Sequence, residues 1–265
     1  MLFNRENAKF MASKKVNVGS VSYLNAKPLI YGFENGMMQD AIELVIDHPA
    51  AIAKQLLEDK IDIGLVPVAI IPFLKEYHIV SDYCIGSDGE VASVCLFSNV
   101  PLEEIETILL DYQSKTSVAL LKILLKEHWN ISPVLVEATE SYEKNIAGTT
   151  AGLVIGDRAF KQRLESTHIY DLGLAWKQMT GLPFVFAAWV SNKEFPAAFK
   201  TDFNKANEAG LNDIESVIQE INYDLFDMNA YFSKNISYQL DLLKKEGLQL
   251  FLKYISNREE EMIIR

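Results

Sequence analysis

The sequence predicts an α/β protein with two lobes around a ligand cleft. In the first third of the chain, short apolar strands alternate with amphipathic helices, a pattern typical of a parallel sheet covered by helices. A second run of strands and helices follows. The apolar stretch 182–190 then has the length and composition of a buried strand that returns the chain to the first lobe. The 265 residues are enough for two cores.

The first lobe is expected to begin with a strand at 15–19, a polar loop, and a helix that Pro28 opens. A strand, a helix starting at His48-Pro49 and a buried strand come next, and this order predicts a βαβ unit with parallel strands. The elements expected up to the second lobe are strands at 41–46 and 61–67, helical turns at 69–74, and strands at 77–85 and 91–98 with a turn at 86–89 between them.

The second lobe is expected to repeat the plan of strand, hydroxyl-rich loop and helix, at 107–112, 113–117 and 118–128. The other elements expected are a short helix at 101–105, strands at 133–137, 151–156 and 169–172, a helix at 159–164, and helices at 194–209, 211–221, 227–233 and 235–257. We therefore predict a discontinuous first lobe, 15–98 plus 191–265, a second lobe, 99–190, and a flexible leader, 1–14, in which Met11 is an alternative start.

Composition narrows the class of partner. The chain has 25 basic and 36 acidic residues, a net charge of −11, which argues against nucleic acid or an anionic membrane as a partner. It has no apolar run long enough to span a bilayer, and the leader does not resemble a secretory signal. Cys84 and Cys95 lie in strand-like sequence and are expected to be buried, reduced thiols. We expect a soluble, cytoplasmic protein; the sequence does not indicate its oligomeric state.

Motifs for common cofactors and metals are missing from the sequence. It contains neither G-x-x-x-x-G-K-[ST] nor a strand-anchored G-x-G-x-x-G for phosphates, and no G-x-S-x-G for a hydrolase nucleophile. Its four histidines are widely scattered, without a zinc-binding spacing. We expect no cofactor and no metal site.

Hydroxyl and amide residues beside two helix starts are the candidate ligand site. The first junction supplies Ser22 and Asn25, and the second supplies Ser114, Thr116 and Ser117. Unpaired N–H groups and the positive end of the dipole make a helix start suitable for an anion. The alternative is that these side chains only cap their helices.

Two further positions stay open at this stage. Ser93 is a lone hydroxyl in an apolar strand, which either faces solvent or needs a buried partner. The pair Asp157-Arg158 fits a hinge ion pair, a ligand clamp, or a helix start with Asp157 as its N-cap.

A series of ordered segments resembles the chorismate dehydratases that open the futalosine route to menaquinone. The segments span roughly residues 16 to 257 and include SYLNAKPL at 22–29, DIGLVP at 62–67, VASV at 91–94, DYQSKTS at 111–117, IGD at 155–157, DLGLAW at 171–176 and GLPFVFA at 181–187. Each segment is weak alone, but their order and spacing are specific.

The resemblance implies a type II periplasmic-binding-protein-like fold and the removal of water from chorismate to give 3-[(1-carboxyvinyl)oxy]benzoate. By motif position, Asn25 and Ser93 are the expected catalytic residues. The expected substrate-binding residues are Ser22, Tyr23, Ser114, Thr116, Ser117, Gly156 and Asp157. No side chain is an obvious base, so the enolpyruvyl carboxylate of the substrate is a candidate. Two alternatives remain: 1,4-dihydroxy-6-naphthoate synthase of the same pathway, which uses a histidine base, and a non-catalytic small-anion binding protein.

Overall fold

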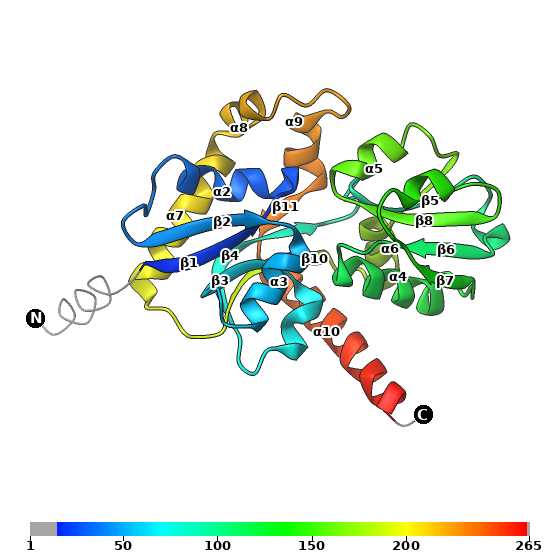
Figure 1. The fold of residues 1–265 in the computed structure, drawn as a ribbon, viewed down its shortest axis with the longest axis horizontal. Helices are drawn as coiled ribbons and strands as arrows, with labels where there is room; N and C mark the ends of the chain where they lie inside the picture. Colours follow the sequence, from blue (N-terminus) through cyan, green and yellow to red (C-terminus); the bar gives the residue numbers. More distant parts are fainter. Residues whose placement is uncertain (1–14, 264–265) are drawn as a thin grey trace, which may run out of the picture.

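The structure, a computed structural model, describes residues 15–263 as two α/β lobes side by side (Figure 1). The predicted leader, 1–14, and its alternative start Met11 lie outside the described residues. The expected fold class is confirmed, because each lobe is built on its own sheet with helices packed on it.

The first lobe contains a six-stranded sheet in the order β11-β4-β10-β3-β1-β2. β1 pairs in parallel with β2 and β3, as expected for a βαβ unit, whereas β10 runs antiparallel between β3 and β4 and β11 runs antiparallel to β4. The bounds are β1 Val16–Val21, β2 Ile42–Asp47, β3 Ile63–Pro67, β4 His78–Ser87, β10 Phe184–Ser191 and β11 Ser237–Gln239.

The second lobe contains a five-stranded sheet in the order β7-β6-β8-β5-β9. β6 pairs in parallel with β7 and β8, and β5 runs antiparallel to β8 and β9. The bounds are β5 Val94–Ser98, β6 Thr107–Leu110, β7 Val134–Glu137, β8 Thr150–Ile155 and β9 His168–Asp171.

Helices cover both sheets. Those of the first lobe are α2 Lys27–Glu34, α3 Pro49–Leu57, α7 Ala197–Asn212, α8 Ile214–Ile221, α9 Met228–Ala230 and α10 Leu242–Ile263. Those of the second lobe are α4 Lys115–Glu127, α5 Asp157–Gln162 and α6 Leu172–Thr180. Short 3-10 turns lie at Leu24–Ala26, Val68–Phe73, Leu102–Glu104 and Tyr142–Asn145, and a π-helical turn lies at Tyr231–Asn235.

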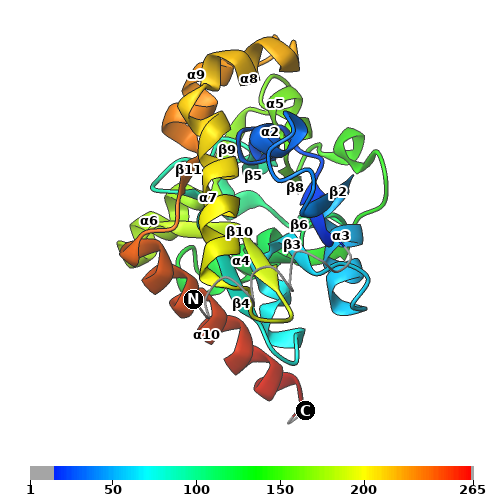
Figure 2. The ribbon, with the colours of Figure 1, turned by 90° about the vertical axis from the view of Figure 1, so that its left-hand side faces the viewer.

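The two long helices of the C-terminal part lie against the first lobe. Figure 2 shows α7 running along this lobe, with α10 below it at the bottom of the view. α7 crosses α2 closely: a Cβ added to Gly32 would lie 2.3 Å from the carbonyl oxygen of Ala206. Only a glycine permits this approach, so the backbone itself forms part of the helix contact.

The core of the first lobe is centred on β10, in which all eight residues are buried. The ring of Trp189 on β10 packs edge-on against Phe33 of α2 and Phe203 of α7. Trp176, on α6 of the second lobe, packs in the same way against Phe184 and thus joins the two cores. Both cysteines are buried and free, as predicted. Among the helices of residues 15–263, not one combines the length and the apolar character of a membrane span.

The structure moves the predicted lobe boundaries at 98 and 190. β5 belongs to the second sheet and β10 to the first, so the chain passes between the lobes at 88–93 and again at 181–183. The predicted turn at 86–89 is therefore wrong: β4 continues to Ser87, and the segment after it crosses to the other lobe. The prediction of continuous helix at 235–257 is also wrong at its start, because β11 extends the sheet beside β4.

Candidate active site between the lobes

A small cavity of about 50 Å³ lies between the lobes and brings the two predicted junctions together. The first lobe supplies one wall from the ends of β1 and β3 and from β4 and β10, and the second supplies the other from β5, β8 and the start of α4. The lining residues are Val21, Tyr23, Asn25, Pro49, Pro67, Ile85, Val91, Val94, Ser114, Ser117, Ile155, Gly156, Phe186 and Ala187.

Asn25 supplies an unpaired polar atom to this cavity. Its side chain is buried in the 3-10 turn that precedes α2, and its Oδ1 has no hydrogen-bond partner in the protein. Its backbone carbonyl is held by the hydroxyl of Tyr238, which donates to it at 3.0 Å. A buried acceptor without a partner costs free energy, about 1–3 kcal/mol, unless a ligand or water satisfies it. The amide oxygen of Asn25 is therefore poised to accept a hydrogen bond from a ligand.

The start of α4 forms the opposite wall. Ser114 is the N-cap, and its Oγ accepts from the backbone N–H of Ser117 at 3.2 Å and lies 3.0 Å from that residue's Oγ. Both side chains are buried and line the cavity, so the positive end of a thirteen-residue helix faces the ligand space. The sequence left capping and anion binding as alternatives here, and this geometry is compatible with both.

Thr116 has a different environment from its neighbours. Its Oγ1 accepts from the backbone N–H of Ala69 at 3.0 Å, and the side chain is fully buried. Ala69 belongs to the first lobe, so this hydrogen bond joins the lobes instead of facing the cavity. Successive residues of a helix point in different directions, which is why Ser117 lines the cavity and Thr116 does not.

Ser93 lies in the crossing between the lobes and is fully buried, so the alternative of a solvent-facing strand residue is wrong. Its Oγ accepts from the hydroxyl of Tyr231 at 2.7 Å. Burial raises the pKa of Tyr231 well above its usual value, and the hydrogen bond to Ser93 opposes that rise. Tyr231 thus contacts one of the two predicted catalytic residues. Ser93 itself does not line the cavity, whereas its neighbours Val91 and Val94 do. It lies 138 residues from Ser93 in the chain, and nothing in the local sequence indicates that they meet.

Tyr23 and Gly156 line the cavity, whereas the neighbouring Asp157, predicted to bind substrate, does not. Gly156, at φ +61°, precedes α5, and a Cβ placed on it would lie 2.8 Å from Cε1 of Tyr23. The Tyr23 hydroxyl donates to Oε1 of Gln113 in the other lobe. The carboxylate of Asp157 accepts from the backbone N–H of Leu24 at 3.2 Å, also across the lobes. Asp157 is therefore not the N-cap of its own helix. Ser22, by contrast, is exposed and does not line the cavity.

Arg158 belongs to the second lobe alone. Its guanidinium lies 2.5 Å from Asp111 and 2.7 Å from Glu143, and Tyr142 donates to Asp111 at 2.9 Å. Burial raises the pKa of Asp111, and the charge of Arg158 opposes that rise. This network fixes the end of β6 from which Gln113 reaches Tyr23. It is neither a hinge ion pair nor a part of the cavity wall.

The described cavity lining has little capacity for acid–base chemistry. Among these residues none is a histidine, aspartate, glutamate, lysine or arginine. Burial raises the pKa of Tyr23, so its phenol stays protonated near neutral pH and acts as a donor. In residues 15–263, no three His, Cys, Asp or Glu side chains come together as a metal site would need. The lining can therefore bind and orient a ligand through neutral hydrogen-bonding groups.

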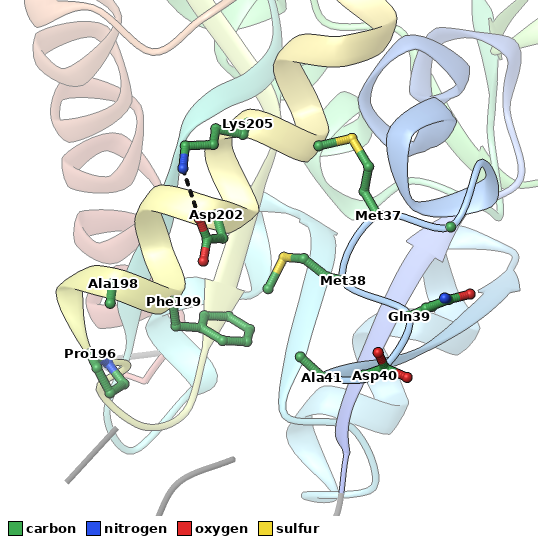
Figure 3. Close-up of a pocket in the computed structure, with 11 residues that line it drawn as sticks. Met37, Met38, Gln39, Asp40, Ala41, Pro196, Ala198, Phe199, Asp202 and Lys205 are labelled. Atoms are coloured by element: carbon green, nitrogen blue, oxygen red, sulfur yellow. Dashed lines mark hydrogen bonds and ion pairs between the residues drawn. The ribbon is translucent and has the colours of Figure 1, made fainter. Parts of the chain in front are cut away.

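A larger hollow of about 520 Å³ lies on the outer side of the first lobe, between the 36–41 turn and α7 (Figure 3). Its walls are mainly apolar, with Met37, Met38 and Phe199 among them. Of the charged residues that line it, Lys205 lies 2.9 Å from Asp202, and Asp40 lies on the turn. None of the predicted site residues lines it. The cavity between the lobes is therefore the candidate active site.

A family described as menaquinone biosynthesis matches residues 16–257. The chain belongs to this family. Two curated relatives bear the name chorismate dehydratase. The one from Thermus thermophilus is 28% identical over 230 residues, which are 76% of this chain and 80% of the relative. The one from Campylobacter jejuni is 25% identical over 245 residues, which are 89% of this chain and 95% of the relative.

Solved structures assign this family member to the periplasmic-binding-protein fold. The periplasmic aliphatic sulphonate binding protein SsuA of Escherichia coli has a TM-score of 0.63 at 13% identity, with 95% of this chain and 88% of that chain covered. A Candida albicans protein described as having the generic periplasmic binding protein fold has a TM-score of 0.60 at 11% identity, with 90% of each chain covered. At these identities the likeness concerns the fold alone, and it confirms the predicted architecture.

Proposed function

We propose that this chain is a chorismate dehydratase, a hydro-lyase that converts chorismate into 3-[(1-carboxyvinyl)oxy]benzoate in the futalosine pathway. The two named relatives support the activity. The observation that carries the proposal is the lining of the cavity, where an unpaired amide oxygen of Asn25 faces the start of α4 and no described lining side chain is a base at neutral pH. Free, buried thiols at Cys84 and Cys95 fit a reducing, cytoplasmic compartment.

Substrate binding requires the lobes to separate and close again. A cavity of about 50 Å³ has room for only a few water molecules, so the described arrangement is a closed one. The hydrogen bonds that join the lobes, Leu24 with Asp157 and Ala69 with Thr116, would open and re-form with each cycle. Closure surrounds the substrate with apolar walls, which strengthens the remaining polar contacts.

The start of α4, with Ser114 and Ser117, is the proposed site for one carboxylate of chorismate. The N–H groups of the first turn that Ser114 does not cap, together with the two hydroxyls, would bind an anion there without a basic side chain. Tyr23 and Gly156 also line the cavity, and the Tyr23 phenol donates its proton to Gln113 in the second lobe. Thr116 then holds the lobes together and does not contact the carboxylate.

The elimination itself breaks the C3–H bond and the C4–O bond of the ring. The electron pair of the C3–H bond forms the new ring double bond. The leaving hydroxide takes up the proton removed from C3, so water is released and the base is regenerated. Because the described lining offers no base, we assign proton removal to the enolpyruvyl carboxylate of the substrate. Asn25 and Ser93 would hold the 4-hydroxyl in the geometry for departure, a contribution of positioning. Aromatisation of the ring supplies the driving force.

The proposal is tested by incubating the purified protein with chorismate and following the product by chromatography and ultraviolet absorbance. We expect 3-[(1-carboxyvinyl)oxy]benzoate to form, and Asn25→Ala to lower turnover strongly while the thermal unfolding midpoint stays near that of the wild type. Chorismate that binds and is released unchanged would show a binding protein instead. Chorismate that neither binds nor reacts would reject the proposal, and with it the assignment of the cavity.

A further inference from the structure

Ser93 has a fixed backbone but a hydroxyl whose direction depends on its neighbours. The preceding loop is held by Asp171, whose carboxylate accepts from the backbone N–H groups of Val91 at 3.1 Å and Ala92 at 2.8 Å. Arg163 donates to the carbonyl of Ala92 at 3.1 Å. The backbone before Ser93 is thus held through both its N–H and its C=O groups, although Ala92 has a left-handed φ of 63°. The Ser93 hydroxyl itself donates only over a long distance, to the carbonyl of Val91 at 3.5 Å, so its direction depends on its other neighbours.

Tyr231 is the neighbour that lies beside this hydroxyl. It is fully buried on the π-helical turn that follows α9, a type of turn often found at functional sites. Its ring packs perpendicular to Phe160 at 4.9 Å and at 87° to Phe226 at 6.1 Å. These rings fix the plane of the phenol, so the position of its oxygen is set by packing.

The direction of the hydrogen bonds around Tyr231 follows from the chemistry of its partners. Burial keeps the phenol protonated by raising its pKa, and its single proton is directed to Oγ of Ser93 at 2.7 Å. The Asn25 side chain also opposes the rise of this pKa, and its Oδ1 has no protein partner. The phenol therefore donates to Ser93, and the Asn25 oxygen stays available for a ligand.

We infer that Tyr231 is a positioning residue that sets the polarity of Ser93. By donating to Ser93, it occupies a lone pair of that oxygen, so the Ser93 hydroxyl acts as a donor. Its proton has only a long contact in the protein, to the backbone carbonyl of Val91 at 3.5 Å, and can be donated to a ligand instead. One substrate hydroxyl can then donate to Asn25 and accept from Ser93. The inference rests on the proposed function, since that hydroxyl is the one that leaves in the elimination.

Tyr231→Phe is the direct test, because it removes the phenol oxygen and keeps the ring that packs on Phe160. We expect kcat to fall about 10- to 100-fold with KM changed less than about threefold, as for a small misplacement of reacting groups. The double variant with Ser93→Ala should be no slower than Ser93→Ala alone, because Tyr231 acts through Ser93. The pH profile of kcat should keep its shape, since the phenol is not the base.

Tyr238→Phe is the matched control. It removes another buried phenol oxygen, one that donates to the backbone carbonyl of Asn25 and leaves the polarity of the side chains unchanged. We expect similar losses of stability in the two variants, but a kcat within about threefold of the wild type in Tyr238→Phe. If Tyr231→Phe does not fold, Phe160→Leu serves instead, because it loosens the ring contact without touching Ser93; a wild-type kcat there would overturn the inference.

The outcomes separate this inference from the proposed function. A wild-type protein that makes no enolpyruvyl benzoate rejects the function. A wild-type protein that is active, together with Tyr231→Phe of equal kcat, rejects only the role of Tyr231. Equal losses of kcat in Tyr231→Phe and Tyr238→Phe would assign Tyr231 a purely structural part and would overturn the inference as well.

Discussion

The contact between Gly156 and Tyr23 gives the sharpest prediction of stability. Gly156 has φ +61° and ψ −149°, a combination that side chains other than glycine hardly adopt. A Cβ at this position would also lie 2.8, 2.9 and 3.0 Å from three ring atoms of Tyr23. Gly156→Ala should therefore combine a backbone cost with a displacement of the ring.

The two costs are of similar size. The backbone strain of a side chain in this region is about 1–3 kcal/mol. Forcing the Tyr23 ring away adds about 1–3 kcal/mol of overpacking, including the hydrogen bond to Gln113. We expect Gly156→Ala to lower the free energy of unfolding by about 2–6 kcal/mol, measured by urea denaturation, and to raise KM because Tyr23 lines the cavity.

Gly148→Ala is the matched control for the backbone share. Gly148 also has a positive φ, +56°, but no atom lies within 4 Å of its added Cβ. The loss of stability in Gly148→Ala should therefore stay near the backbone cost of about 1–2 kcal/mol. In a Tyr23→Ala background the extra cost of Gly156→Ala should disappear. Equal losses of unfolding free energy in Gly156→Ala and Gly148→Ala, in the wild-type background, would refute the idea that the Tyr23 ring is rigidly held.

Three further predictions concern the contacts around the cavity. Thr116→Val leaves the buried N–H of Ala69 without an acceptor and should lower the free energy of unfolding by about 1–3 kcal/mol in urea denaturation, with little change in KM. Arg158→Met leaves the Asp111 carboxylate buried without its cation and should cost about 3–5 kcal/mol in the same measurement. Burial raises the pKa of Asp157 from 3.8 to about 6. The folded state therefore holds this proton more tightly, and the resulting stabilisation is full below about pH 4 and lost as the pH rises through 6. The stability of the wild type relative to Asp157→Asn should fall by about 1–3 kcal/mol between pH 4 and 7, measured by denaturation across that range.

Each of these predictions has a control. Thr116→Ser keeps the hydroxyl and should retain most of the stability. A raised KM in Thr116→Val with unchanged stability would instead support the original prediction that Thr116 binds the carboxylate. Lys205→Met breaks the exposed pair with Asp202 and should cost less than about 1 kcal/mol. A difference between the wild type and Asp157→Asn that does not vary with pH would show that Asp157 titrates normally in the folded protein.

The kinds of elements and their order could be predicted from the sequence because those signals are local. Apolar alternation and helical periodicity give β1, α3 and β3 without knowledge of the rest of the chain. Capping near the start of α4 was also foreseen as an alternative, because its signal is local, but the sequence placed this start at 118 and did not single out Ser114 as the N-cap. The ordered motifs further supplied the family and the expected positions of Asn25 and Ser93.

What only the tertiary structure decided are the contacts between distant parts of the chain. An apolar strand carries no signal for its partners, so β5 and β10 were predicted in the wrong lobes, and the three residues of β11 are too few to show a period. The packing angle of α4 decides that Ser117 faces the cavity while Thr116 bonds to Ala69. The meeting of Tyr231 with Ser93 depends on the path of the whole C-terminal part across the cleft. Local sequence determines what each segment can form; which side chains share the cavity depends on how the two lobes pack.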